Sequence, residues 1–358
     1  MDTNVILRPR PRGAGRRALA AVCGIAALAA APAGAQDKPG TTAAPFLALG
    51  VDARGAAMGS AQSATSAGAA ALYWNPSALG LAGAGARPGS GQAVFSNNEW
   101  FVGSRLQFFG VALNAGDLGT FGLSVTAMDY GEEAVTTVEQ PEGTGEMYAA
   151  LDLAVGVHYA RALTDRFAVG GTVKLIRQQI WNESASGAAV DLGVTYRTDY
   201  RGLTIGMALA NFGTDMHMTG RDLRRRIDIA PGQGGNNDGL PAELETGYWP
   251  MPLIFRVGVA ADPVRSGDHR VTLALDGQAP SDNSQSASAG MEYGFRDLFF
   301  VRGGYRQAFT SISEDGGWAA GFGLKYRFDE RFGVSFDYVF QEYEPFGTPQ
   351  MFSLGVAF

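Results

Sequence analysis

The side chains most able to do chemistry are three histidines and one glycine-rich acidic stretch. His158, His217 and His269 stand far apart in the sequence and share no metal-ligand spacing. A Ser–His–acid site stays open, because such a site is defined by geometry, but no nucleophile motif is present. Residues 234–239 lack the Asp-x-Asp spacing and the distal Glu of a calcium loop. The sequence therefore predicts no enzyme, no metal and no cofactor.

Nine charged residues occur at positions that alternate with aliphatic ones. They are Lys174, Asp191, Arg256, Asp276, Glu292, Arg302, Arg306, Lys325 and Asp337. In a strand, alternate side chains point to opposite faces, so these charges share the face opposite the aliphatic residues. A cation on a lipid face would cost about 2–4 kcal/mol near the membrane midplane. We expect all nine to face a lumen. They would form an ion-pair network that holds a barrel and plug together or, alternatively, a substrate path.

The elements that must position these charges are 14 alternating segments, which run from about residue 91 to the end of the chain. Leu151, Leu153 and Val155, for example, alternate with Asp152 and Ala154. A soluble β-sandwich also alternates, but its strands usually have about 5–6 residues. Several segments here alternate over roughly 9–11 positions, the length of a tilted membrane-spanning strand. The pattern predicts an all-β fold, a 14-stranded antiparallel transmembrane β-barrel over residues 91–358.

The connections between these segments differ in length. Tight turns at 116–118, 163–165, 296–297 and 329–330 are interspersed with longer polar links at 131–147, 214–250, 308–316 and 342–349. Outer-membrane barrels have short periplasmic turns and longer outer loops. With both termini in the periplasm, every long link falls on the outer side. The longest link holds Arg221, Arg224, Arg225 and Arg226, which are either solvated or contact lipopolysaccharide phosphates or a protein partner.

The carboxyl terminus is the most informative stretch of the chain. Phe352, Leu354, Val356 and Phe358 alternate with small or polar residues, and the chain stops on Phe358. A terminal strand that ends in Phe resembles the sorting signal that bacterial outer-membrane barrels present to the barrel-assembly machinery. The resemblance implies that Phe358 is the sorting residue, and that the protein lies in lipid of a Gram-negative-type outer membrane.

The amino terminus has the features of an export signal. Five arginines precede a short apolar run at 19–31, and Ala33-Gly34-Ala35 has the small residues of a cleavage site. We therefore predict a cleaved signal peptide over 1–35, which removes Cys23, the only cysteine. The mature chain would keep 23 basic and 34 acidic residues, a net charge of −11. This acidic balance argues against nucleic-acid binding.

Residues 36–90 differ from the barrel segments because they are rich in Ala and Gly and lack period two. We expect a periplasmic lead-in followed by an N-terminal plug of short, closely packed helices. The stretch carries two motifs, one with Gly50, Arg54, Met58 and Gly59, the other with Tyr73, Trp74, Asn75 and Pro76. These residues resemble the PorV/PorQ family, which is related in fold to the FadL-type fatty-acid channels. Ser77 and Ala78 replace that family's usual Ala and Gly.

The resemblance implies two functions. PorV and PorQ relatives act with type IX secretion, where the barrel receives exported cargo and passes it on to surface attachment. The alternative is a FadL-like transporter for hydrophobic small molecules. The implied partners are therefore secreted cargo or secretion-system components in the first case and a hydrophobic ligand in the second. Under either function, Trp74 is expected to pack in a hatch that seals the barrel, or else to belong to a movable gate.

Overall fold

The fold is described by a computed structural model that covers residues 39–358 except 85, 201, 230–238, 309–316 and 344–346. The predicted signal peptide at 1–35 lies outside these residues, as does most of the 308–316 link. No helix in the described part of the chain is long and apolar enough to cross a membrane.

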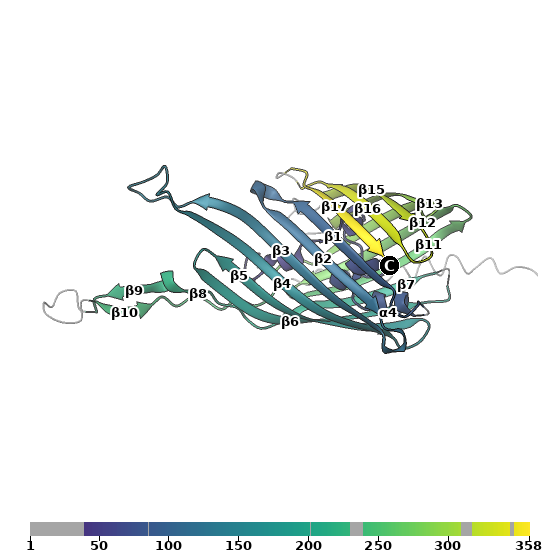
Figure 1. Cartoon of the computed structure of the whole chain (residues 1–358), viewed down its shortest axis with the longest axis horizontal. Helices are drawn as coiled ribbons and strands as arrows, with labels where there is room; N and C mark the ends of the chain where they lie inside the picture. The colour runs from purple at the N-terminus through teal and green to yellow at the C-terminus, as the bar shows by residue number, and fades with distance from the viewer. Residues whose placement is uncertain (1–38, 85, 201, 230–238, 309–316, 344–346) are drawn as a thin grey trace, which may run out of the picture. The chain divides into compact units, whose positions relative to one another are not determined.

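Fourteen antiparallel strands form a closed barrel, as the sequence predicted (Figure 1). Strand β17 pairs with β1, and the β5–β6 pairing completes the ring. The barrel strands of the first half are β1 (Gly91–Glu99), β2 (Arg105–Asn114), β3 (Thr120–Ala134), β4 (Met147–Ala162), β5 (Phe167–Ile180), β6 (Glu183–Arg197) and β7 (Thr204–Gly213). Those of the second half are β11 (Ile254–Ser266), β12 (His269–Pro280), β13 (Ser286–Phe295), β14 (Phe299–Ala308), β15 (Gly317–Arg327), β16 (Gly333–Gln341) and β17 (Gln350–Ala357).

The two faces of each strand follow the predicted alternation. On β17, Leu354 and Val356 are exposed on the outside, whereas Met351 and Ser353 are buried on the inside. The outer face carries mainly aliphatic and aromatic side chains, and the inner face carries small, polar and charged ones together with buried apolar side chains such as Phe108 and Ile176. This is the arrangement that a barrel in lipid requires, because lipid cannot satisfy polar side chains.

The connections gather at the two ends of the barrel. We call the end with connections 115–119, 163–166, 198–203, 267–268, 296–298 and 328–332 the turn end, and the opposite end the loop end. The strand ends that the four predicted long links connect all lie at the loop end, although β5 and β6 are joined there by only two residues. The longest link is not structureless, since it holds β8 (Thr219–Gly220), η5 (Arg221–Leu223), β9 (Arg224–Ile227) and β10 (Leu240–Glu243). Two further 3-10 turns are η3 (Phe101–Gly103) and η4 (Gly116–Leu118).

Residues 39–90, here called the amino-terminal segment, pack against the inner face of the barrel (Figure 1). The segment starts at the loop end, where Ala43 N donates to Pro250 O (2.9 Å). It finishes at the turn end, where Asn114 Nδ2 donates to Gly83 O (2.8 Å). Its elements are η1 (Pro45–Ala48), α2 (Ala53–Ala57), η2 (Gly68–Ala70), α3 (Ala71–Trp74) and α4 (Ala78–Gly83).

This path differs from the expected one, in which the segment would enter from the side of the carboxyl terminus. The segment itself crosses the lumen once before β1 begins. Because the number of barrel strands is even, β1 begins and β17 finishes at the same end, the turn end. The crossing by the segment is additional, so residues 39–44 and the carboxyl terminus lie at opposite ends of the barrel. Period-two alternation counts strands only and therefore could not reveal this crossing.

Candidate functional site

The candidate site is the contact between the amino-terminal segment and the barrel wall. Asn75 ends helix α3 with extended backbone angles, as expected for a residue before proline. Its buried amide donates to Ser63 O (2.7 Å) and to Val194 O on β6 (3.2 Å). Its oxygen accepts from the Ser77 hydroxyl (2.5 Å). Asn75 therefore ties three parts of the chain together just before buried Pro76 redirects it.

Trp74 is held by the residue that caps the preceding helix. Asp52 is the N-cap of α2 and accepts from Gly55 N (2.9 Å). The other carboxylate oxygen of Asp52 accepts a hydrogen bond from the Trp74 indole N–H. Trp74 is only 3% exposed, and a side chain on Gly50 would meet its ring at 3.3 Å. Gly50 of the first motif therefore leaves room for the Trp74 ring of the second motif.

Tyr73 and Arg256 form an aromatic–cation stack beside this indole. The Tyr73 hydroxyl lies 2.6 Å from Leu49 O and 3.0 Å from Leu47 O, so the phenol donates to the start of the segment. The Arg256 guanidinium, from β11, lies over the rings of Tyr73 (5.8 Å) and Trp74 (5.5 Å). A cation over an aromatic face is attracted by the ring quadrupole, and more strongly when both are desolvated. Arg256 therefore contacts the amino-terminal segment through cation–π interactions with Tyr73 and Trp74.

Glu292 on β13 is the centre of an ion cluster. Its carboxylate accepts from Arg54 Nε of helix α2 (2.9 Å), Arg302 Nε (2.7 Å) and Arg270 (3.2 Å). Arg302 also pairs with Asp337 (2.5 Å). Arg54 donates onward to Thr65 O (2.9 Å). A charged helix residue of the segment is therefore fixed to three neighbouring wall strands through one carboxylate that is 2% exposed.

The other predicted lumen charges have separate partners. Lys174 pairs with Asp191 (2.8 Å), and Asp276 accepts from Ser63 N of the segment (2.7 Å). Arg306 donates to Glu342 O (2.6 Å) and lies over the Tyr343 ring (3.3 Å). Burial raises the pKa of the Tyr343 phenol, so it stays protonated. Lys325 shares the inner register but is exposed, so the structure does not bring it into the cluster with Glu292.

Close backbone contacts account for the remaining motif residues and for several that the sequence analysis missed. Gly59 has a positive φ of 63°, and a Cβ on it would lie 2.6 Å from Tyr305 O of β14. Opposite it, a Cβ on Gly304 would lie 2.2 Å from Gly59 N. Met58, beside it, is fully buried against alanines. The sequence analysis did not predict Gly304 or other glycines of the barrel wall as site residues. Small residues at inward-facing strand positions could have indicated them.

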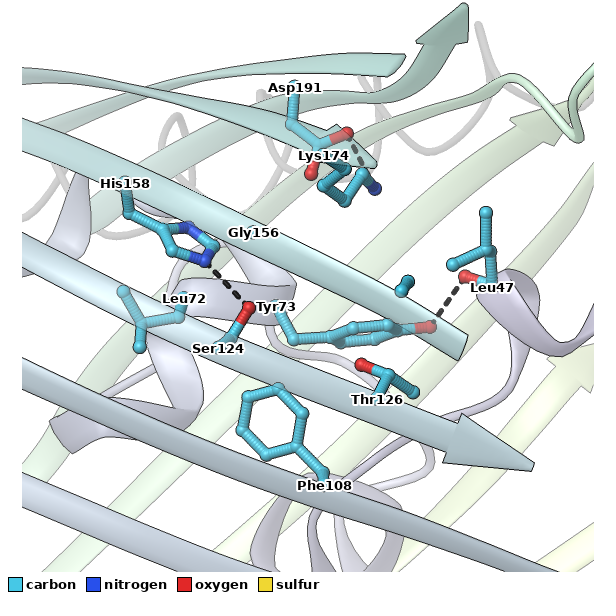
Figure 2. Close-up of a pocket in the computed structure, with 11 residues that line it drawn as sticks. Leu47, Leu72, Tyr73, Phe108, Ser124, Thr126, Gly156, His158, Lys174 and Asp191 are labelled. Carbon is cyan, nitrogen blue, oxygen red and sulfur yellow. Dashed lines mark hydrogen bonds and ion pairs between the residues drawn. The ribbon is translucent and has the colours of Figure 1, made fainter. Parts of the chain in front are cut away.

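A cavity of about 20 Å³ lies between the segment and strands β2–β6, lined by Leu47, Leu72, Tyr73, Phe108, Ser124, Thr126, Ala154, Gly156, His158, Lys174 and Asp191 (Figure 2). This volume holds about one water molecule. The buried His158 ring lies 2.8 Å from Ser124 Oγ and 2.7 Å from Thr172 Oγ1. In a Ser–His–acid site a carboxylate would bond to the second ring nitrogen of the histidine. Here the Thr172 hydroxyl occupies that position.

The other two histidines lie elsewhere: His217 packs against Tyr248 with the two rings tilted by 35°, and His269 bonds to the Tyr293 hydroxyl. Over the described residues, no group of three His, Cys, Asp or Glu side chains is placed to hold a metal.

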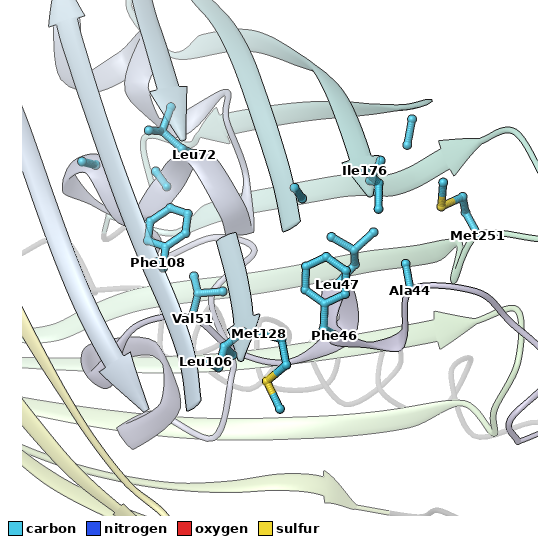
Figure 3. Packing of buried hydrophobic residues seen from close by; sticks show 14 of the residues in the cluster. Ala44, Phe46, Leu47, Val51, Leu72, Leu106, Phe108, Met128, Ile176 and Met251 are labelled. Carbon is cyan, nitrogen blue, oxygen red and sulfur yellow. The ribbon is translucent and has the colours of Figure 1, made fainter. Parts of the chain in front are cut away.

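An apolar cluster completes the contact near the loop end. Phe46 and Leu47 of η1 are buried together with Met128, Ile176 and Met251, which come from the wall and from the last residues before β11 (Figure 3). Burial of such side chains contributes roughly 1.5–3 kcal/mol each. The start of the segment is therefore held at the loop end by packing as well as by hydrogen bonds.

A closed 14-stranded antiparallel barrel, apolar outside and polar inside, is the architecture of outer-membrane β-barrel proteins. Within this class, residues 33–205 match the family described as "Type IX secretion system protein PorV". This part of the chain is similar to the family, as the two motifs indicated, and the match includes both of them. No curated protein matches the chain by sequence.

Solved structures with the same fold are FadL-like barrels. The chain is similar to the toluene transporter TbuX of Ralstonia pickettii, with 15% identity, a TM-score of 0.51, and coverage of 86% of this chain and 97% of that one. It is similar to the Pseudomonas putida toluene transporter TodX, with 15% identity, a TM-score of 0.52 and the same coverage. A FadL homologue of Pseudomonas aeruginosa gives 11% identity, a TM-score of 0.53, and coverage of 86% and 98%. At these identities the likeness shows the fold alone.

Proposed function

We propose that the protein is a non-enzymatic outer-membrane component of a type IX-like secretion system, which binds exported cargo or a secretion partner at its loop end. The family match over residues 33–205 carries this proposal. The structure adds a physical reason for docking at the loops. The amino-terminal segment is bonded to the wall at the loop end and continues covalently into β1 at the turn end. Movement of a polypeptide through the lumen would have to displace a segment that is fixed at both ends.

The test is affinity purification from the native outer membrane, with a deletion strain to follow secretion. We expect secreted proteins or secretion components to co-purify, and cargo to accumulate in the periplasm of the deletion strain. A variant with Arg224, Arg225 and Arg226 changed to Ser tests whether the exposed β9 arginines contribute to docking. The matched control, Arg331→Ser, changes an exposed arginine at the turn end. Normal secretion in the deletion strain would contradict the proposal.

A FadL-like transporter of hydrophobic small molecules is the second candidate. It is supported by the fold shared with barrels that are described as toluene transporters. The cavity of about 20 Å³ is far smaller than toluene, so a ligand there would require the segment to move. Loss of toluene uptake in the deletion strain, with secretion unchanged, would favour this candidate over the first.

A further inference from the structure

We propose that strand β9 binds an acidic strand of the docked partner by β-strand addition along its free edge. The proposal deepens the proposed function and rests on it for the identity of the partner, a secreted cargo protein or a secretion component. The site belongs to the β9–β10 ribbon, residues 224–227 and 240–243, which projects past the ends of β5 and β6 at the loop end (Figure 1).

The base of this ribbon is fixed to the barrel. Strand β8 pairs with the start of β6, and Thr219 Oγ1 donates to Ser184 O (3.3 Å). Asp222 N donates to Glu183 Oε1 (2.9 Å), and Asn182 Nδ2 donates to Asp222 Oδ2 (2.6 Å). The ribbon is therefore positioned before a partner arrives, which lowers the ordering cost of binding.

Hydrogen bonding between the two strands shows which backbone groups of β9 face outward. Leu244 N donates to Leu223 O (2.9 Å), and bonded pairs alternate with non-bonded pairs along an antiparallel ladder. In the register of the ribbon, Arg224 and Arg226 therefore occupy non-bonded positions. Pro241 stands opposite Arg226, and a residue without an N–H group fits such a position. The backbone N–H and C=O groups of Arg224 and Arg226 consequently point away from β10.

The two outer edges of the ribbon differ in what they offer a further strand. Over the described residues β9 pairs only with β10, so its outer edge is free. The outer edge of β10 presents Pro241, which cannot donate, and Glu243, which repels acidic groups. An unpaired edge is a template for another strand, and peptides are recognised in this way in other proteins. The edge of β9 is therefore the one open to an acidic strand.

The side chains along β9 define the charge of the added strand. Arg224, Arg225 and Arg226 are exposed, and none of them forms an ion pair with another described residue. The link over 131–147, also at the loop end, holds five glutamates and no basic residue. Opposite charges attract and like charges repel an approaching partner, so an acidic strand is directed to β9 and away from that link.

Alternation divides these side chains between two faces. Arg224 and Arg226 share one face of β9, and Arg225 shares the other with Ile227, which is 43% exposed. Cross-strand pairs of opposite charge and pairs of apolar side chains both stabilise a sheet. The added strand would therefore carry acidic side chains at alternate positions on one face, and an acidic and an apolar side chain on the other.

Binding of a fluorescent peptide to the full protein in detergent, at low salt, tests the site. The probe is a short peptide of alternating glutamate and valine. The control peptide has the same sequence with every backbone nitrogen methylated, so that it keeps all charges but cannot donate to an edge. We expect methylation to weaken binding by about tenfold or more, because several backbone hydrogen bonds are lost. This comparison requires no change in the protein.

A pair of substitutions at one position separates charge from backbone bonding. Arg226→Ser removes the charge and should weaken binding about threefold. Arg226→Pro also removes the outward N–H group and should weaken binding by about a further fivefold. Pro241, directly opposite, shows that proline fits this position of the ribbon. Arg331→Ser, at the turn end, should bind the peptide as the wild type does.

Equal binding of the two peptides, or equal weakening by the two Arg226 variants, would overturn the proposal. Side-chain charge alone would then account for the contact, as it would for the phosphate of a lipid head group. The test is separate from that of the proposed function. Peptide discrimination together with normal secretion in the deletion strain would reject the secretion role and keep the strand-addition site. Defective secretion without peptide discrimination would do the reverse.

Discussion

The backbones of Gly59 and Gly304 touch: a Cβ on Gly304 would stand 2.2 Å from Gly59 N. The first glycine belongs to the amino-terminal segment and the second to the inner face of β14, so their contact sets how closely the segment approaches the wall. We expect Gly304→Ala to lower the free energy of unfolding by about 1–3 kcal/mol through overpacking. A folded outer-membrane barrel migrates differently on detergent gels before and after boiling, and the unboiled form is called the heat-shifted band. The measurement is the denaturant concentration at which half of this band is lost.

Gly303→Ala is the control, because a Cβ there meets nothing nearer than 3.9 Å. This variant should unfold within about 0.5 kcal/mol of wild type. Equal destabilisation by the two substitutions would mean that the effect arises from the strand itself and not from the contact between segment and wall.

Trp74→Ala should loosen the segment while the barrel persists. Removal of a fully buried tryptophan costs about 3–5 kcal/mol, and it also removes the indole partner of Asp52. In planar bilayers the variant should show raised or more strongly fluctuating conductance, with the heat-shifted band kept. Trp318→Ala, at a position 66% exposed on the outer face, should leave conductance unchanged. Wild-type conductance with lost partner binding would instead place Trp74 in the recognition site.

Glu292→Gln should destabilise the protein by about 3–5 kcal/mol, because it removes the buried charge that Arg54, Arg270 and Arg302 share. Arg54 loses its only ion pair among the described residues. Asp268→Asn removes an exposed pair with Arg296 (2.8 Å) and should cost less than about 1 kcal/mol. Denaturant unfolding in detergent measures both. A small effect of Glu292→Gln would show that the cluster is dispensable for holding the segment.

Leu175→Arg should lower folding yield far more than Gln179→Arg does. Both residues face outward on β5, but Leu175 lies near mid-strand, whereas Gln179 is next to the loop end and to Trp181. A lipid-facing cation costs about 2–4 kcal/mol at the midplane and about 0–1 kcal/mol near the interface. Folding into lipid vesicles, followed on gels, provides the comparison. Similar yields would indicate that the outer face of β5 does not contact lipid.

Phe358→Ala should impair membrane assembly more than Phe352→Ala. Both are aromatic residues of the last segment, and Phe352 packs against Phe95 at 6.2 Å. If the terminal aromatic ring is the sorting residue, its loss reduces recognition even though the backbone bonds to Gly91 remain possible. Membrane levels of the two variants measure the difference. Equal levels would show that the assembly machinery does not recognise the ring of Phe358.

The sequence by itself determined the number of strands, the face of each and the family motifs. Alternation is a local property, so Leu354 on the outside and Ser353 on the inside follow from period two alone. The Asn75–Pro76 step likewise ends its helix for reasons contained in two neighbouring residues. None of this depends on how distant strands meet.

Only the tertiary structure decided which inner residues touch and where the amino-terminal segment begins. Arg270 is not among the nine charged residues predicted to face the lumen, yet it reaches the same carboxylate as Arg54 and Arg302. Gly59 and Gly304 lie 245 positions apart in the sequence, and their contact depends on the depth at which the segment sits in the lumen. Strand tilt and register set these distances once the barrel closes. The end of the barrel at which the segment begins likewise depends on a crossing of the lumen, which leaves no periodic trace in the sequence.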